Sequence, residues 1–197
     1  MYTFSHKVLS VPVAKYIAEY RDADRFIAYC KECKRYDRCW SCPPFHFDTL
    51  EYISAYKTAF IIGTKIVPDV SAKTEFLQSK KASYQIIKEV RSVLDPRLLN
   101  METLLFGSRA FFAGTCYICP GEKCERIFGR PCIAPGRMRP TLEAFGFDIE
   151  KTTSQLLGME MKWGKNGVLP EYLILVSGFF TNQNIARSEI YKLIVRD

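Results

Sequence analysis

Two dense groups of cysteines constrain this chain more than any other feature of its sequence. The first group has the spacing C-x2-C-x5-C-x2-C, and the second has the spacing C-x2-C-x4-C-x7-C. The first consists of Cys30, Cys33, Cys39 and Cys42, and the second of Cys116, Cys119, Cys124 and Cys132. Two residues between cysteines allow both sulfurs of a turn to face one centre while backbone amides stabilise the thiolate charge. Each group therefore predicts a metal-binding loop.

Disulfides, structural zinc and iron–sulfur clusters are the three kinds of site that such cysteines form. A reducing compartment argues against disulfides, whereas four cysteines in C-x-x-C pairs satisfy the tetrahedral geometry of zinc. Prolines follow Cys42 and Cys119, as is common at cluster-ligating cysteines, and apolar residues such as Trp40 and Phe128 flank the two loops. These features favour one or two 4Fe–4S clusters, with zinc as the alternative and all eight cysteines as candidate ligands.

The polarity of the chain indicates a cytoplasmic protein. The segment MYTFSHKVLSVPVAKY is too polar for the apolar centre of a signal peptide. No apolar run approaches the roughly 20 residues that a membrane-spanning helix needs. We therefore expect reduced thiols and no membrane partner.

A formal net charge of +7 indicates an acidic partner. Each four-thiolate zinc site or oxidised 4Fe–4S site would add a charge of about −2, which weakens the case for nucleic acid. Basic residues occur in both cysteine loops: Lys31, Lys34, Arg35, Arg38, Arg126, Arg130, Arg137 and Arg139. We interpret them as a docking face for a redox partner protein or an anionic substrate. Nucleic acid is a less favoured partner, and a solvated surface that balances the thiolate charge is the simplest alternative.

The hydrophobic pattern predicts a single α+β domain over residues 1–197, with cysteine-rich loops at about 30–45 and 116–140. Strands separated by helices favour a mixed sheet with helices packed on it, and a ferredoxin-like sandwich is one such arrangement. In the first part of the chain we expect a strand at Tyr2–Leu9, a helix from Pro12 to Tyr20, an apolar turn at Asp24–Tyr29, a helix from the capping residue Asp48 to Tyr56, and a strand TAFIIGTKIV that ends at Pro68.

In the second part of the chain, proline and glycine set the expected boundaries. A long amphipathic helix from Ser71 to Leu94 is expected to break where Asp95 precedes Pro96, and a second helix to run to Phe106. The remaining expected elements are a strand RAFFAGT, a short helix TLEAF stopped by Gly146, a closing hairpin of EMKW and EYLILVSGFF around a turn at Lys165–Gly167, and a helix from about Asn184.

The ordered motifs CKEC, WSCPPF, CYIC and RPTLEAFGFDIEKT resemble those of an uncharacterised family of predicted metal-binding, cysteine-rich, iron–sulfur-type proteins that is common in anaerobic microbes. The resemblance extends from Cys30 to the segment LILVSGFF. It implies metal binding by an iron–sulfur cluster and supplies no established reaction. It carries a ligand role over to seven cysteines: Cys30, Cys33, Cys42, Cys116, Cys119, Cys124 and Cys132.

Cys39 stands outside the matched pattern, so the resemblance does not decide whether the first loop supplies three ligands or four. A three-cysteine cluster would keep an iron free for substrate, whereas a four-cysteine cluster would favour electron transfer. Three functions follow as hypotheses: electron transfer or reductive activation of a partner, a zinc-stabilised or nucleic-acid interaction module, and an enzyme with an open cluster site. His46 lies close enough to Cys42 to be a spare ligand, although an ordinary loop histidine is the favoured interpretation. Glu143 could orient Arg139 toward the second loop, although a surface pair four residues apart is the favoured interpretation.

Overall fold

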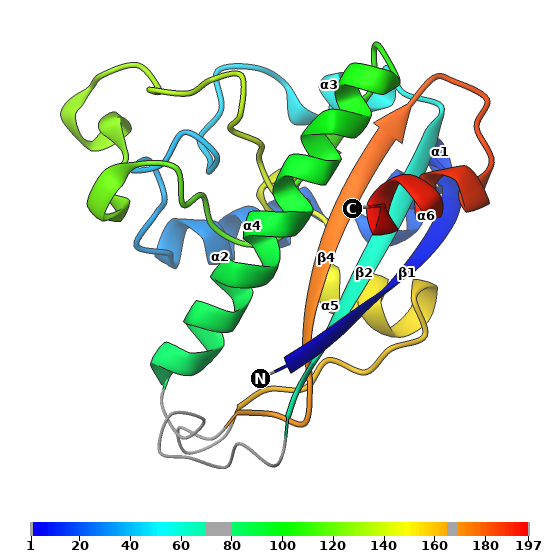
Figure 1. The fold of residues 1–197 in the computed structure, drawn as a ribbon. Helices are drawn as coiled ribbons and strands as arrows, with labels where there is room; N and C mark the ends of the chain where they lie inside the picture. The colour runs from blue at the N-terminus through cyan, green and yellow to red at the C-terminus, as the bar shows by residue number, and fades with distance from the viewer. Residues whose placement is uncertain (1, 70–79, 165–168, 197) are drawn as a thin grey trace.

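Within residues 2–69, 80–164 and 169–196, which the computed structural model describes, a four-stranded antiparallel sheet lies at the centre of the fold (Figure 1). Its strand order is β1-β2-β4-β3. The strands are β1 at Tyr2–Pro12, β2 at Thr58–Pro68, β3 at Arg109–Phe111 and β4 at Leu173–Thr181. Each strand pairs antiparallel with its neighbour. The predicted α+β class is confirmed, whereas the predicted mixed sheet is wrong.

The helices are α1 at Val13–Tyr20, α2 at Ala23–Glu32, α3 at Thr49–Ser54, α4 at Lys80–Leu104, α5 at Ile149–Lys151 and α6 at Arg187–Val195. Shorter turns are η3 at Pro120–Glu122, η4 at Glu125–Phe128, η5 at Glu143–Phe145 and the π-helical η6 at Thr152–Leu156. No helix in the described ranges is long and apolar enough to cross a membrane.

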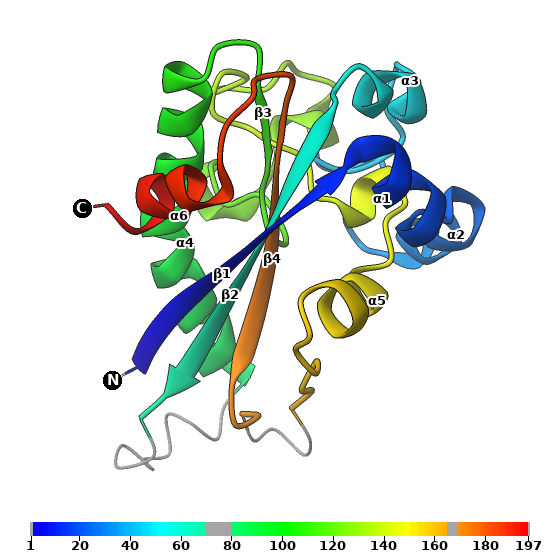
Figure 2. The ribbon, with the colours of Figure 1, turned by 90° about the vertical axis from the view of Figure 1, so that its right-hand side faces the viewer.

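The sheet has an apolar core on each face because successive side chains of a strand point to opposite sides. Ile61 and Phe180 pack with α1, α3 and α5 on one face. Phe60 and Phe179 pack with α4 and α6 on the other face. Figure 2 shows this division, with α4 and α6 on one side of the strands and α1, α3 and α5 on the other. The near-continuous apolar runs of β2 and β4 follow from burial on both faces.

Helix α4 continues through Pro96, so the predicted break at Asp95 is wrong. Proline has no N–H to give to the carbonyl of Ser92, which normally kinks or ends a helix. Leu94 and Leu98, on either side of it, are both fully buried against the sheet and hold the two halves in line. Tertiary packing therefore outweighs the local preference. The expected helical residues 71–79 lie outside the described residues.

The predicted closing hairpin is also wrong. Strand β4 pairs with β2 on one side and with β3 on the other, and residues 159–164 form no strand. The hydroxyl of Tyr172 donates to the carbonyl of Glu160 at 2.8 Å, so this segment runs beside the start of β4 without joining the sheet. The predicted turn at Lys165–Gly167 lies outside the described residues.

The connections match a ferredoxin-like sandwich only in part. In the sequence, α4 connects β2 to β3, and in the sheet β4 lies between these two strands. This arrangement is a split βαβ unit. Strands β1 and β2 instead pair directly, although α1, α2 and α3 separate them in sequence. Two predicted end signals are confirmed: Asp48 accepts hydrogen bonds from the amides of Leu50 and Glu51 at the start of α3, and Gly146 ends η5 with a φ of +85°.

Candidate metal centre

Helix α2 brings the first cysteine loop into place. Asp22 caps the helix by accepting a hydrogen bond from the amide of Arg25, and Cys30 lies in its last turn. The helix start lies against Gly146, where an added Cβ would come within 2.7 Å of the Cα of Ala23. The glycine thus serves two purposes, because it ends η5 and allows α2 to approach.

Tight turns orient the sulfurs of the first loop. The amide of Cys33 donates to the carbonyl of Cys30, and the amide of Cys42 donates to that of Cys39, both at 3.0 Å. These are the local turns that the C-x-x-C spacing predicts. The hydroxyl of Ser41 lies between two sulfurs, 3.2 Å from Cys39 and 3.9 Å from Cys42. Ser41 and Cys39 are buried, so this turn is the interior of the loop.

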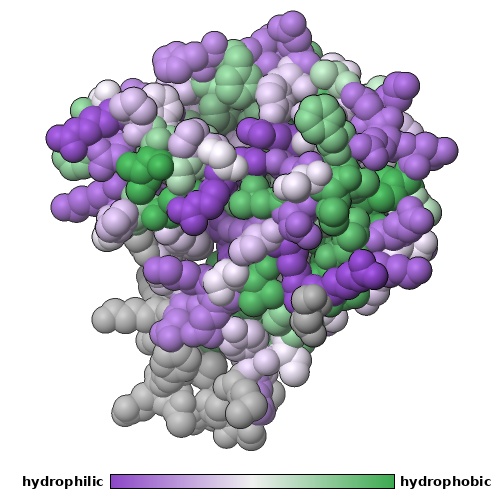
Figure 3. All heavy atoms as spheres, turned by 45° about the horizontal axis from the view of Figure 1, so that its top comes forward, coloured by the Kyte–Doolittle hydropathy of each residue, from purple (hydrophilic) through white to green (hydrophobic). Residues whose placement is uncertain are grey.

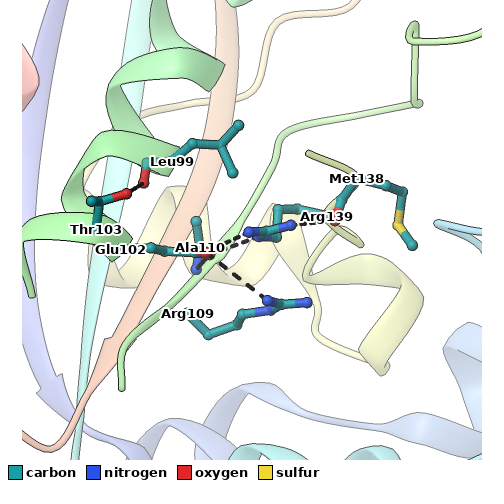
Figure 4. A network of polar contacts seen from close by, with 7 residues as sticks. All are labelled: Leu99, Glu102, Thr103, Arg109, Ala110, Met138 and Arg139. Carbon is teal, nitrogen blue, oxygen red and sulfur yellow. Dashed lines mark hydrogen bonds and ion pairs between the residues drawn. The ribbon is translucent and has the colours of Figure 1, made fainter. Parts of the chain in front are cut away.

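Two buried arginines attach the second loop to α4. At its start, Arg91 of α4 donates to the carbonyl of Thr115 and pairs with Asp95 at 2.7 Å. At its end, Arg139 donates through Nε to Glu102 of α4 at 2.7 Å, and its side chain is only 6% exposed. Figure 4 shows that Glu102 also accepts a hydrogen bond from the amide of Ala110 in β3. Both ends of the loop are therefore fixed to one helix.

Arg126 of the second loop joins the two loops. Its guanidinium donates to the carbonyls of Cys39, Cys42 and Pro44 and to the carboxylate of Asp37, at 2.7–3.2 Å. Only 7% of its side chain is exposed. Since these four acceptors all belong to the first loop, one cation organises that loop from outside.

Trp40 makes the reciprocal connection from the first loop to the second. Its amide donates to the sulfur of Cys124 at 3.5 Å, and its indole N–H donates to the carbonyl of Arg130 at 2.9 Å. The guanidinium of Arg126 lies 5.0 Å from its ring centroid, within the range of a cation–π contact. Figure 1 shows the two loops side by side, next to α2 and α4.

Thiols of the two loops meet at Cys39. Its sulfur accepts hydrogen bonds from the thiols of Cys116 and Cys42, which lowers the pKa of Cys39. The pKa values of Cys42 and Cys116 rise, first because each gives its hydrogen bond to Cys39 and then because of burial.

The remaining cysteines extend this group in both directions. Burial raises the pKa of Cys30, and neighbouring Cys33 raises it further. Burial also raises the pKa of Cys119, against a hydrogen bond from the amide of Glu125, and nearby Cys124 and Cys132 add to the rise. Cys33 likewise raises the pKa of Cys42, and Cys119 raises that of Cys116, so cysteines within each loop influence one another.

The donor set fits a thiolate-bound metal. All eight cysteines are free thiols, and backbone amides point at the sulfurs of Cys116, Cys119 and Cys124. Thr115 Oγ1 and Glu143 Oε2, close to the group, are buried without a hydrogen-bond partner among the described residues. In those same ranges, no three His, Cys, Asp or Glu side chains are gathered closely enough to hold a single ion. The thiols are instead spread along both loops.

Comparison with known proteins agrees with this chemistry. A family model described as predicted metal-binding protein, DUF2284, matches residues 16–177, which include all eight cysteines. The chain belongs to the DUF2284 family. The resemblance noted from the motifs is thus confirmed, and with it the expectation of a cysteine-rich metal-binding protein. No curated protein and no solved structure shows a significant match.

The structure corrects the interpretation of several charged residues. Arg126 and Arg139 do not belong to a basic surface, because both bind carbonyl or carboxylate groups inside the protein. Arg139 has Glu102 as its carboxylate partner, so the expected pairing with Glu143 is wrong. His46 is exposed. Two residues of the site were not indicated by the motifs: Arg91, which binds the start of the second loop, and Ser41, which lies between two sulfurs. Arg91 stands close in sequence to the apolar residues Val90 and Leu94, which are buried, and this pattern could have indicated a buried arginine.

Proposed function

We propose that this chain binds one or two 4Fe–4S clusters through the cysteines of its two loops, and that it serves in electron transfer or in reductive activation of a partner protein. The observation that carries the proposal is that the two cysteine loops are joined at their cysteines: the amide of Trp40 donates to the sulfur of Cys124, and Arg126 donates to the carbonyls of Cys39 and Cys42. Ligands from both loops would thereby share one environment. A cluster supplies a one-electron donor and acceptor whose potential depends on burial and on hydrogen bonds to sulfur.

The arrangement of the thiols supports a cluster over a single zinc ion. Zinc needs its sulfurs at about 2.3 Å around one point, whereas a cluster binds thiolates at separate irons. Among the described residues no three such side chains gather around one point, and the eight free thiols are distributed over two loops. Because the proposal requires free thiols, it also places the protein in a reducing compartment such as the cytoplasm.

The surface of the second loop supports a protein partner. Phe128 and Ile133 are each 55% exposed, and Arg130 lies beside Phe128 with its guanidinium 5.4 Å from the ring. Figure 3 shows that apolar side chains reach the surface in groups surrounded by hydrophilic ones. An apolar patch with a cationic edge suits a redox protein with an acidic rim. Nucleic acid is less favoured, because Arg126 and Arg139 are already engaged inside the protein.

Purification without oxygen, followed by assays for iron, sulfide and zinc, tests the metal. We expect iron with acid-labile sulfide, and a broad visible absorbance that bleaches with dithionite. Electron paramagnetic resonance of the reduced protein should then show a cluster signal. Stoichiometric zinc without sulfide, in protein kept strictly anaerobic, would falsify the cluster and select the zinc module.

Nucleic-acid binding is tested on the same preparation. We expect only weak binding of duplex and single strands at physiological salt. Tight binding with a steep salt dependence, lost when Lys34 and Arg35 are both replaced by Gln, would contradict the redox proposal and support a nucleic-acid module.

A further inference from the structure

The hydroxyl of Ser41 lies inside the first cysteine loop, between two sulfurs. It is 3.2 Å from the sulfur of Cys39 and 3.9 Å from that of Cys42. Ser41 is only 1% exposed, and Cys39 is 3% exposed. Within the part of the chain that the structure describes, these two sulfurs are the only hydrogen-bond partners of the hydroxyl. Its hydrogen-bonding capacity is therefore used entirely by cysteines.

Filling space does not explain a serine at this position. Burial of a hydroxyl carries a desolvation cost, and a thiol sulfur is a weak acceptor that offsets this cost only in part. Alanine would fill nearly the same space without the cost. A hydrogen bond to a charged acceptor is much stronger than one to a neutral acceptor. The serine therefore suits a state of the loop in which a neighbouring sulfur is a thiolate.

Metal binding would fix the direction of this hydrogen bond. Between a hydroxyl and a thiol, either atom can donate. A cysteine that binds a metal has lost its proton and can only accept. If Cys39 is a ligand, Ser41 donates to it. If Cys39 is not a ligand, its thiol can donate to the serine oxygen, and the serine proton is left for Cys42, which the family pattern predicts as a ligand. In both cases the proton of Ser41 lies on a ligand sulfur.

A donor at a ligand sulfur changes the reduction potential of an iron–sulfur cluster. Reduction adds one negative charge, which the ligand sulfurs share, so a hydrogen bond to sulfur stabilises the reduced state more than the oxidised state. Burial strengthens the effect, because the surroundings screen it only weakly. A backbone amide makes a similar contact in the second loop, where Trp40 donates to Cys124 at 3.5 Å. Ser41 differs because its donor belongs to a side chain and can be removed by substitution.

We propose that Ser41 raises the reduction potential of the cluster in the first loop by donating a hydrogen bond to a ligand sulfur. Ser41 is thus a positioning residue, which acts through the cysteine that it contacts. The inference rests on the proposed function, since it requires a cluster. It adds to that function the residue that sets the potential of one loop.

A redox titration of protein purified without oxygen, followed by electron paramagnetic resonance, tests this role. The test variant is Ser41→Ala, with Ser41→Gly as a second variant that also lacks the hydroxyl. Ser41→Thr keeps the hydroxyl. The matched control is Thr115→Val, which removes a buried hydroxyl next to Cys116 that has no hydrogen-bond partner among the described residues. Iron and sulfide are measured in each preparation, so that potentials are compared at equal cluster content.

We expect Ser41→Ala and Ser41→Gly to lower the equilibrium constant for reduction about tenfold, which corresponds to about 59 mV for one electron. Ser41→Thr and Thr115→Val should keep a potential close to that of the original protein. If each loop holds a cluster, only one of the two potentials should fall. An unchanged or higher potential in both variants without the hydroxyl, or an equal fall in Thr115→Val, would overturn the proposal.

Electron–nuclear double resonance in deuterium oxide gives a second readout that a purely structural role would not change. The original protein should show an exchangeable deuteron coupled to the reduced cluster, and the variants without the hydroxyl should lack it. The same deuteron signal in all of them would overturn the proposal. A cluster whose potential ignores Ser41 contradicts this inference alone, whereas protein without iron and sulfide contradicts the proposed function and this inference together.

Discussion

Phe60, Phe179 and Phe180 fill the layers around the sheet with almost no exposure, whereas the space between the two cysteine loops holds Arg126, Ser41 and thiols. The first region follows the usual rule that burial of apolar surface drives folding. The second is held together by hydrogen bonds of a guanidinium group to backbone carbonyls and by the contacts of Trp40 with the second loop.

This difference indicates that the two regions gain stability from separate sources. A hydrogen bond contributes only about 1 kcal/mol net, whereas full burial of a Phe side chain contributes about 1.5–3 kcal/mol. Metal binding adds folding free energy to the residues that hold it. We therefore expect the sheet with its helices to fold without metal, and the cysteine loops to depend on it.

The largest effect is expected from Phe60→Ala, which opens a cavity between the sheet and α4. Loss of a buried Phe typically lowers the free energy of unfolding by about 3–5 kcal/mol. Denaturant unfolding should show the same loss with and without metal. A loss that appears only in the metal-loaded protein would break the proposed separation of the two regions.

Replacement of a cysteine should lower the metal content rather than the free energy of unfolding of the sheet. Cys132→Ser removes a ligand that the family pattern predicts, and oxygen is a poor substitute for thiolate sulfur. We expect a clear loss of iron with little change in unfolding of the sheet. Unchanged iron and an unchanged electron paramagnetic resonance spectrum would contradict a cluster in the second loop.

The iron content of Cys39→Ser tests whether Cys39 is a metal ligand, a role that the family pattern does not assign to it. The contacts of Cys39 with Cys42 and Cys116 lead us to expect iron loss comparable to that of Cys132→Ser. Iron content retained in Cys39→Ser alone would instead assign three native ligands to the first loop and favour an open iron.

A smaller effect is expected from Arg126→Gln, which leaves the buried carbonyls of Cys39 and Cys42 without their donor. Each unsatisfied buried group costs about 1–3 kcal/mol. The loops should release metal faster to a chelator, measured by absorbance. Arg130→Gln, whose side chain is 69% exposed in the same loop, is the control and should leave the release rate unchanged. Equal rates of metal release from both variants would show that Arg126 does not stabilise the metal-binding loops.

The smallest effect is expected from Asp48→Ala at the start of α3, between the first loop and the sheet. Loss of the cap should lower the free energy of unfolding by about 1 kcal/mol, with no change in metal content. Calorimetry and an iron assay on one preparation check both. A reduced iron content would show that the loop depends on this helix.

The sequence predicted those features that depend on neighbouring residues. The turns of the C-x-x-C pairs, the Asp48 cap and the Gly146 stop are local, and the apolar run of β2 is long enough to identify it as buried. The candidate cysteines were predicted as two separate groups for the same reason, because the spacing within a loop says nothing about the distance to another loop.

Contacts between distant residues could not be predicted in this way. Arg126 and Pro44 are 82 positions apart, and Trp40 and Arg130 are 90 apart. The helix through Pro96 failed as a prediction because tertiary packing overrode a local signal, and the hairpin failed because β4 found partners far away in the sequence. Arg126 was similarly interpreted as a surface residue because most of its acceptors are backbone carbonyls, and Arg139 because its carboxylate partner, Glu102, is 37 positions away.

Hydrogen–deuterium exchange, compared between metal-loaded and metal-stripped protein without oxygen, tests most directly whether the two loops form one metal-dependent unit. We expect amides at 33–47 and 113–140 to lose protection together on removal of the metal, while those of β1, β2, β4 and α4 keep theirs. Loss of protection in one loop only, or an equal loss throughout the sheet, would contradict it.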